Sequence, residues 1–406
     1  MNLTIYCQNA TKERKMAVKN RVTILVMDSV GIGAQPDAEE YDSINASTFQ
    51  HAADSDTAFS LPVLTDLGIG NIQGVIGVTA STRPRASFGR MKEISCGCDT
   101  FIGVWEMAGV VFNKRFVSYN PELPINLLKQ LWNKIGCQTL CNQYMSGIIA
   151  LDLYAERHFA SRLPIVYTCD DGVILIAAHE NVITPGELHQ IAERMSEFFT
   201  NHGVSRIIAR TFIGNKGSFE RTNNRRDFVI GIPTDSHHLF SNLRKNGVEF
   251  VATQHLATIF GEQTVDRIIP GIKDSAGIMK SACQWISEKK SGVAMFVVPD
   301  FDMSGHRKEP MAYANDLMAF DQKLGELLSL TDGDDYVFIT ADHGCDPTLP
   351  IRGHTREYVP LLVYNGKRKI GNSLQTRQTF ADLGQTVLDI MDTPPMPLGL
   401  SFAQWL

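Results

Sequence analysis

Three apolar stretches of the sequence each end on an acidic residue. They read VTILVMD at 22–28, VAMFVVPDFD at 293–302 and YVFITADH at 336–343. Histidines stand at or shortly after two of these ends. Carboxylate oxygens and imidazole nitrogens are common ligands of divalent ions such as Mn²⁺ and Zn²⁺. The candidate metal ligands are therefore Asp28, Asp302, His306, Asp342, His343 and His354.

Six such donors, three for each ion, suit a centre of two divalent ions with room left for a phosphate. Asp342 and His343 are adjacent, and in extended geometry they would point to opposite sides, so they serve two ions, or one ion in a turn. Asp302 and His306 lie in what we predict to be a glycine-containing loop, PDFDMSGHR, which turns both toward one ion. A single aspartate at a strand end is as often a helix cap or a turn residue. The repetition at separate strand ends favours the metal site.

A hydroxyl group lies in the glycine-containing segment ISCGCDTFIGVWE at 94–106. A hydroxyl that bridges two divalent cations is acidified and becomes a nucleophile toward phosphorus. Thr100 is therefore the candidate catalytic residue. Asp99 and Thr100 are equally suited to cap the N-terminus of a helix, and this structural interpretation stays open.

Short apolar runs alternate with stretches of helical periodicity, which predicts an α/β fold with a buried, largely parallel sheet. Strands are predicted at 22–27, 164–168, 172–178, 206–211, 248–252, 293–298, 336–340 and 359–364, and helices at 311–330 and 380–392. Ligands gather at the carboxyl ends of the strands in such sheets. If the three acid-terminated strands share one sheet, the middle of the chain is an insertion.

The length of 406 residues favours two domains. We predict an N-terminal tail at 1–20, a metal-binding catalytic core formed by 21–113 and 233–406, and an inserted cap domain at 114–232. Residues 1–20 are polar and basic, without the apolar segment of a signal peptide.

The composition argues against two classes of partner. A net charge of −6 and an isoelectric point near 6.0 give no electrostatic case for nucleic acid or an anionic membrane. The apolar runs are far shorter than the roughly 18 residues of a membrane span. The eight cysteines lack the CxxC…CxxC spacing of a structural zinc site, and we expect a reduced, cytoplasmic protein.

The motifs resemble those of the phosphopentomutase family, in the alkaline phosphatase superfamily. The matching segments run nearly the full length of the chain: MDSVGIGAQPDA at 27–38, SLPVLTDLGIG at 60–70, GCDT…GVWEMAG at 97–109, VYTCDDGV at 166–173, RIIARTFIGNKGSFERTNNRRD at 206–227, TADHGCDPT at 340–348 and HTREYVPLLVY at 354–364. The combination of TADHGCDPT with HTRE is highly specific.

This resemblance implies an alkaline-phosphatase-like, doubly wound, mostly parallel sheet core with an inserted α/β cap domain. It implies two divalent metal ions, of the Mn type, with Zn as the alternative. One ion would be held by Asp28, Asp342 and His343, and the other by Asp302, His306 and His354. Phosphorylated Thr100 would donate its phosphate to one hydroxyl of a ribose or deoxyribose phosphate, giving a bisphosphate, and then recover phosphate from the other of C1 and C5.

The chain departs from the family pattern away from the proposed metal ligands. Cys98 and His255 replace lysines, Val104 replaces a histidine and Cys169 replaces a serine. The segment DFDMSGHR is also one residue shorter than in the family. The candidate substrate-binding residues are Asp171, Arg210, Arg225 and His255. The arginines are also compatible with an ordinary solvated surface.

These departures leave the function open between three interpretations. The first is a phosphomutase that interconverts (deoxy)ribose 1-phosphate and 5-phosphate. The second is a mutase that acts on a different phosphosugar. The third is a metal-dependent phosphohydrolase, in which water takes the phosphate from Thr100. In each case the partner is a small phosphorylated sugar, and the oligomeric state stays open.

Overall fold

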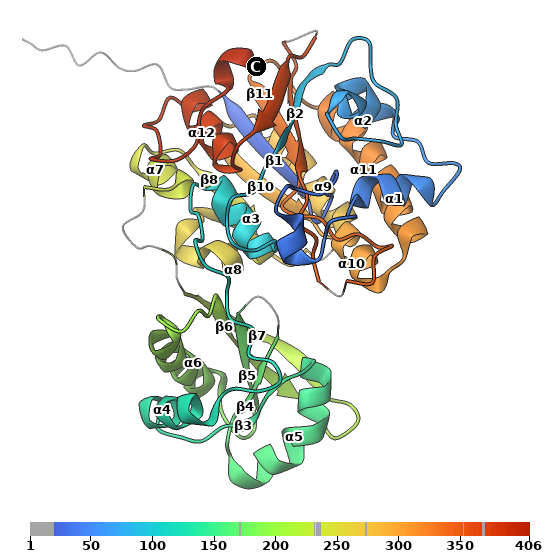
Figure 1. Ribbon diagram of the computed structural model, residues 1–406. Helices are drawn as coiled ribbons and strands as arrows, with labels where there is room; N and C mark the ends of the chain where they lie inside the picture. Colours follow the sequence, from blue (N-terminus) through green and yellow to red (C-terminus); the bar gives the residue numbers. More distant parts are fainter. Residues whose placement is uncertain are drawn as a thin grey trace, which may run out of the picture.

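The computed structural model describes residues 20–169, 172–230, 232, 237–272, 274–351, 353–367 and 370–406 (Figure 1). The predicted N-terminal tail, apart from Asn20, lies outside these residues. Among the described residues, no helix combines the length and the apolar character that a membrane span requires.

An eight-stranded sheet forms the larger part of the molecule, in the order β13-β2-β12-β11-β1-β10-β8-β9 (Figure 1). The strands are β1 Arg21–Met27, β2 Ala86–Met91, β8 Phe250–Thr253, β9 Arg267–Ile269, β10 Gly292–Val298, β11 Asp335–Thr340, β12 Val359–Asn365 and β13 Ser373–Arg377. Among the described strand pairs of this sheet, only those that β12 makes with β11 and β2 are antiparallel. Every residue of β1 and β10 is buried, as expected for central strands covered on both faces.

Helices pack on both sides of this sheet (Figure 1). One group packs around the long helix α11: α1 Thr48–Asp54, α2 Pro62–Leu67, α9 Ser275–Ser287, α10 Asp300–Arg307 and α11 Pro310–Ser329. A second group packs around α12: α3 Thr100–Met107, α7 Leu239–Lys245 and α12 Ala381–Ile390. Helix α8, Gln254–Phe260, follows β8 directly. Short 3₁₀ helices span Ala38–Tyr41, Ile69–Asn71, Glu262–Thr264 and Ala403–Trp405.

A second, five-stranded sheet lies below the first in Figure 1, in the order β3-β4-β5-β6-β7. Its strands are β3 Leu140–Tyr144, β4 Ile165–Thr168, β5 Val173–His179, β6 Arg206–Ile213 and β7 Glu220–Val229, and its helices are α4 Ile125–Ile135, α5 Gly147–Ser161 and α6 Pro185–Phe199. Two separate apolar clusters cover it, one with α4 and α6 and the other with α5. All these elements fall inside the predicted insertion at 114–232, whose boundaries stay a prediction.

The predicted fold class is confirmed: the chain is α/β, with a large, mostly parallel sheet. All eight predicted strands and both predicted helices are present, with ends that differ by at most two residues. One local prediction was wrong. The segment with Asp302 and His306 is not a loop but part of helix α10, so the spacing of four residues places both side chains on one helical face.

Candidate metal centre and nucleophile

The three acid-terminated strands are neighbours at the centre of the large sheet. Strand β1 pairs in parallel with β10 on one side and with β11 on the other, and Met27 lies opposite Val298. The carboxyl ends of the three strands therefore meet at one edge. Asp28 follows β1 directly, α10 begins two residues after β10, and Asp342 lies two residues beyond β11.

Asp28, Asp342 and His343 form one group of possible ligands, and all three are buried. His343 Nε2 lies 3.4 Å from Asp28 Oδ1 and 3.6 Å from Asp342 Oδ2. Asp342 Oδ1 accepts hydrogen bonds from the backbone N–H groups of Ser29 (3.0 Å) and His343 (3.1 Å). Strand β11 ends at Thr340, and Asp342 and His343 belong to one group, which favours the predicted alternative of one ion in a turn over that of two ions.

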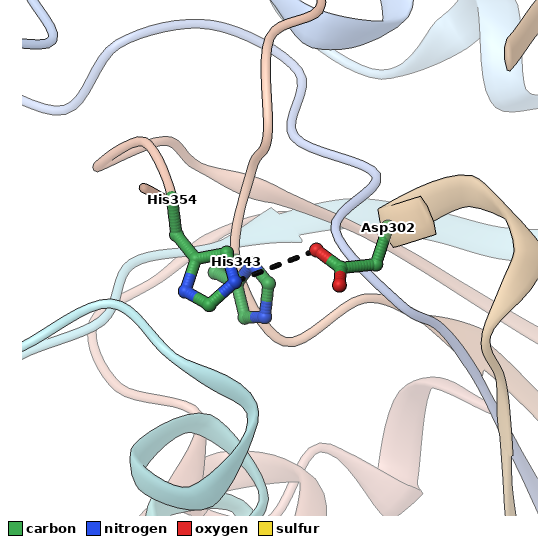
Figure 2. A group of neighbouring side chains, drawn as sticks. All are labelled: Asp302, His343 and His354. Carbon is green, nitrogen blue, oxygen red and sulfur yellow. Dashed lines mark ion pairs between the residues drawn. The ribbon is translucent and has the colours of Figure 1, made fainter. Parts of the chain in front are cut away.

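Asp302, His306 and His354 converge beside this first group. Asp302 Oδ2 lies 3.3 Å from His306 Nε2, and Asp302 Oδ1 lies 3.4 Å from His354 Nε2. The two Nε2 atoms are 3.1 Å apart. Figure 2 shows the His343 ring packed against that of His354, with ring centroids 4.0 Å apart. The structure thus brings all six predicted ligands together, in two adjoining groups.

Electrostatics in the first group favour a bound cation. Burial, together with the charges of Asp342 and Asp302, raises the pKa of Asp28 well above its usual value. Burial lowers the pKa of His343 to about 4, which keeps its imidazole neutral. The Nδ1 of His343 lies 3.2 Å from the carbonyl oxygen of Gly344, and donation to this oxygen leaves the Nε2 lone pair for a ligand.

The donor atoms also pass a test of fit to a metal ion. Asp342 Oδ2 is buried and accepts no hydrogen bond within the described part of the chain. A buried carboxylate oxygen without a partner is costly unless a cation compensates it. In the second group, the hydrogen bonds of Asp302 with His306 and His354 lower the pKa of its carboxyl group even though burial raises it. Both groups are therefore suited to divalent ions, which carboxylate and imidazole donors bind.

Thr100 is the first residue of α3 and faces the first group. Its Oγ1 lies 3.3 Å from Asp28 Oδ1 and 3.1 Å from His343 Nε2. Asp99 caps the helix, because its side chain accepts a hydrogen bond from the backbone N–H of Ile102 (3.0 Å). The capping interpretation therefore holds for Asp99, while the threonine hydroxyl points into the metal-ligand cluster.

Gly103 allows α3 to approach this cluster closely. A Cβ atom at position 103 would lie 2.6 Å from the backbone oxygen of Asp342 and 2.9 Å from its Cβ. A larger residue would therefore push the helix, and Thr100 with it, away from the strand end.

A cavity of about 1090 Å³ lies between the two sheets. It is lined by residues of β6 and β7 and by residues of α8 and the segments that follow it, and these include Arg210, Arg225 and His255. Burial and the charges of Arg206 and Arg225 lower the pKa of His255 to about 4. Three of the four predicted substrate-binding residues thus share one cavity, while the fourth, Asp171, lies outside the described residues.

The sequence of this chain matches known proteins over almost its whole length. Residues 20–395 match the Metalloenzyme superfamily. The phosphopentomutase of Alkaliphilus oremlandii is 37% identical over 94% of this chain and 98% of that protein. Those of Clostridium novyi (38%, over 94% and 98%) and Acetivibrio thermocellus (40%, over 90% and 94%) are similarly related. The chain belongs to the phosphopentomutase family. Among solved structures, Leishmania mexicana phosphoglycerate mutase aligns with a TM-score of 0.49 and 12% identity over 95% of this chain and 98% of that one.

The four departures from the phosphopentomutase pattern lie in different surroundings. Cys98 lies beside the metal-ligand cluster, with its Sγ 3.8 Å from the backbone oxygen of His354. Val104 is fully buried within α3. Cys169 Sγ lies 3.9 Å from the backbone oxygen of Val173, at the end of β4. His255 lines the cavity between the sheets.

Arg356, in the HTRE motif, fixes the loop that precedes the nucleophile. Its side chain is buried, and Nη1 donates to Glu93 Oε2 (2.7 Å) and to the backbone oxygens of Ser95 (2.9 Å) and Gly97 (2.6 Å). Nη2 donates to the backbone oxygen of Glu93 (2.9 Å) and to Asp37 Oδ2 (3.0 Å). Burial raises the pKa of Glu93 well above its usual value although Arg356 opposes this effect.

Replacing Arg356 with methionine is expected to lower the free energy of unfolding by about 3–5 kcal/mol. The change leaves a buried acid and two buried carbonyl oxygens without their partner. Chemical unfolding of the metal-free protein would measure the loss. The matched control is Arg85→Met, because the ion pair of Arg85 with Asp66 is half exposed (48% and 51%) and contributes at most about 1 kcal/mol. Equal losses in the two variants would contradict the role of Arg356.

Four further residues lie in the motifs TADHGCDPT and HTREYVPLLVY but were not predicted to have a role: Arg356, Glu357, Asp346 and Cys345. Glu357 is buried and accepts four hydrogen bonds, from Gly33 N, Thr48 N and the hydroxyls of Thr48 and Thr355. Charged residues directly before an apolar strand are the signal that could have identified Arg356 and Glu357. No comparable signal marks Cys345, whose partners come from α10.

Proposed function

We propose that this protein is a phosphopentomutase that interconverts (deoxy)ribose 1-phosphate and 5-phosphate through phosphorylated Thr100. The observation that carries the proposal is the position of the Thr100 hydroxyl. Its oxygen lies 3.1 Å from His343 Nε2 and 3.3 Å from Asp28 Oδ1, in a buried cluster of aspartate and histidine side chains that can bind metal ions. The similarity to phosphopentomutases over the length of the chain supports the choice of substrate.

The proposed centre takes two divalent ions, most simply Mn²⁺. Asp28, Asp342 and His343 would hold one, and Asp302, His306 and His354 the other. When bound, such ions neutralise charge on the transferring phosphoryl group and acidify the hydroxyl that attacks it. The three carboxylates suit Mn²⁺, and the three imidazoles also suit Zn²⁺.

The protein's own groups position the nucleophile. Asp28 Oδ1 accepts the hydrogen bond of the Thr100 hydroxyl and orients its oxygen toward the cluster. The threonine lies at the N-terminus of α3, where the positive end of the helix dipole favours a phosphate. The loop before it is fixed by Arg356, so the hydroxyl is oriented before substrate binds.

The reaction then proceeds in two balanced transfers. First, the bond between phosphorus and Thr100 Oγ1 breaks as a bond forms to the free hydroxyl of the sugar phosphate, which gives a bisphosphate. Second, Thr100 Oγ1 attacks the other phosphate of the bisphosphate and the sugar oxygen leaves. In each transfer the attacking hydroxyl loses a proton and the departing oxygen gains one. The cycle restores phosphorylated Thr100 and releases no free phosphate.

The cavity between the sheets is the proposed substrate site. The guanidinium of Arg210 makes one hydrogen bond within the described residues, from Nε to the backbone oxygen of Thr222 (3.1 Å). Burial and the charges of Arg221 and Arg225 lower the pKa of Arg210, while Tyr167 and Asp227 oppose this effect. Arg225, by contrast, is paired with Asp227 at 2.7 Å. Arg210 is therefore the better placed to bind a phosphate, and Arg225, His255 and Asp171 are proposed to complete the site.

Replacing Arg210 with glutamine is expected to lower kcat/KM about 10- to 100-fold, mainly through a higher KM. The change removes a charge-assisted contact to phosphate of about 1.5–3 kcal/mol. Steady-state kinetics with ribose 1-phosphate would measure it. The control is Arg83→Gln, because Arg83 is exposed and does not line the cavity. Equal kinetics for both variants would exclude Arg210 from substrate binding.

A coupled assay tests the proposed function. The protein is loaded with Mn²⁺ and given ribose 1-phosphate while ribose 5-phosphate and free phosphate are followed together. Conversion without phosphate release supports the mutase. Phosphate release alone would replace it by a phosphohydrolase. No reaction in either channel would contradict the pentose substrate and favour a mutase for another phosphosugar.

The cytoplasmic location of the protein stays a prediction from the cysteine spacing.

A further inference from the structure

A buried cysteine lies beside the proposed metal ligands and has no part in the proposed mechanism. Cys345 has no exposed surface, and its Sγ is within 4.8 Å of ligand atoms of Asp302 and His306. His306 and Cys345 are hydrogen-bonded to each other through their side chains. We propose that Cys345 joins Asp302 and His306 as a ligand at the second metal position, and that this alternative ligand set is selective for a thiophilic divalent ion such as Zn²⁺.

The fold holds the thiol in this place from two directions. The turn that contains Cys345 is fixed by paired backbone hydrogen bonds between Gly344 and Thr355 (3.1 and 2.7 Å). Helix α10 approaches from the other side through Gly305, where an added Cβ would lie 2.8 Å from the cysteine Sγ. This close approach places the thiol against the same helical turn that carries Asp302 and His306.

The chemistry of the donors decides which ion this position prefers. Carboxylate and imidazole donors suit Mn²⁺, whereas a thiolate shifts preference toward Zn²⁺ and Co²⁺. Binding releases the thiol proton to solvent as the sulfur–metal bond forms. With His354 close by, an ion there has up to four protein ligands, the number typical of closed zinc sites. Such an ion leaves no position for a phosphoryl oxygen, so Zn²⁺ bound through Cys345 is expected to inhibit phosphoryl transfer.

The inference rests on the proposed function only for its inhibitory consequence. The metal position itself depends on the placement of the three side chains. Its test therefore measures metal binding directly and needs no activity.

The full chain, freed of metal and titrated with Co²⁺, gives the first test. The wild-type protein is expected to show thiolate-to-cobalt charge-transfer absorption in the near ultraviolet. Cys345→Ser is expected to lose this band and keep the weaker visible bands of cobalt bound to oxygen and nitrogen. Cys98→Ser is the matched control, because Cys98 also lies beside the centre, and it should keep the charge-transfer band. Absence of the band from wild-type protein, or its loss only in the Cys98 variant, would overturn the proposal.

Competition with a chromophoric zinc chelator gives the second test. Cys345→Ser is expected to lower the affinity for Zn²⁺ at least about 10- to 100-fold. Loss of an outer-shell partner of a metal ligand already has an effect of about this size, and loss of a direct ligand should have a larger one. Its Mn²⁺ affinity should change much less. Equal losses for both ions would indicate a structural effect and would overturn the selectivity. If the cobalt band is present but the coupled assay finds no mutase activity, the proposed function fails and this site stands.

Discussion

Replacement of Thr100 by alanine is expected to abolish phosphoryl transfer while leaving the metal content of the protein unchanged. Removing a covalent nucleophile typically lowers kcat on the order of 10⁶-fold. The hydroxyl hydrogen-bonds to Asp28 and His343, but the donors of both metal groups remain in place without it. Alanine is also well tolerated at the first position of α3. The coupled assay and elemental analysis of the same sample would measure both properties.

Thr100→Ser is the control for this prediction, since serine retains a hydroxyl at the same position and should retain activity. Intact-mass spectrometry of wild-type protein treated with substrate should show one added phosphoryl group, and the alanine variant should show none. Turnover near the wild-type level in Thr100→Ala would disprove the nucleophile assignment. Loss of metal together with activity would instead show that the threonine acts mainly as a ligand.

The sequence carried most of the information about the large sheet. The central strands β1, β10 and β11 are continuous apolar runs, because both faces are covered, and such runs are recognisable without tertiary information. The acids that follow them were identified from the rule that functional residues gather at the carboxyl ends of parallel strands. These two observations predicted that the acids at the three strand ends lie at one sheet edge, whereas the division of the six donors between two ions came from the resemblance to phosphopentomutases.

The elements that were missed lack such a pattern. Strand β7 reads ERTNNRRDFV and is largely exposed at the edge of its sheet. Most of its side chains face solvent or the cavity rather than a hydrophobic core, so the sequence lacks the apolar pattern of a buried strand. Strand β9 has only three residues. The strands β2, β3 and β13 mix polar and apolar residues, and the pairing of β2 and β13 joins residues about 285 positions apart. Tertiary contacts of this kind decide strand formation where local propensity is weak.

Parts of the site were unpredictable for a related reason. The contacts of Cys345 with α10, and those of Arg356 with the loop before Thr100, join segments distant in sequence. The change of the Asp302–His306 segment from loop to helix shows the same limit, because its glycine suggested a turn. In the structure that glycine is needed for the approach of Cys345 to the helix.

Asp342→Asn is expected to release metal from the first group and to lower activity by at least about 100-fold. Asparagine retains an oxygen that can accept the backbone hydrogen bonds of Ser29 and His343. It removes the charge, and it places an amide N–H₂ where the unpartnered Oδ2 now lies. Loss of a direct ligand should exceed the roughly 10- to 100-fold effect of losing an outer-shell partner. Elemental analysis after gel filtration would measure the metal content of each variant.

The matched control is Asp346→Asn, four residues further along the same loop. Asp346 is equally buried, but its oxygens are occupied by Ser47, His51 and Thr348, so its replacement should leave metal content unchanged. Full metal occupancy in Asp342→Asn would contradict the ligand set.

Thermal unfolding separates the role of Asp342 as a ligand from a purely structural one. Without metal, Asp342 repels Asp28, since its charge helps to raise the pKa of that carboxyl group. The asparagine variant should therefore have a Tm equal to or higher than that of the wild type in the presence of a chelator. With Mn²⁺ the order should reverse, because only the wild type gains the full free energy of metal binding. A side chain that served only to hold the loop would lower the Tm equally in both conditions, and that result would contradict the metal-binding role.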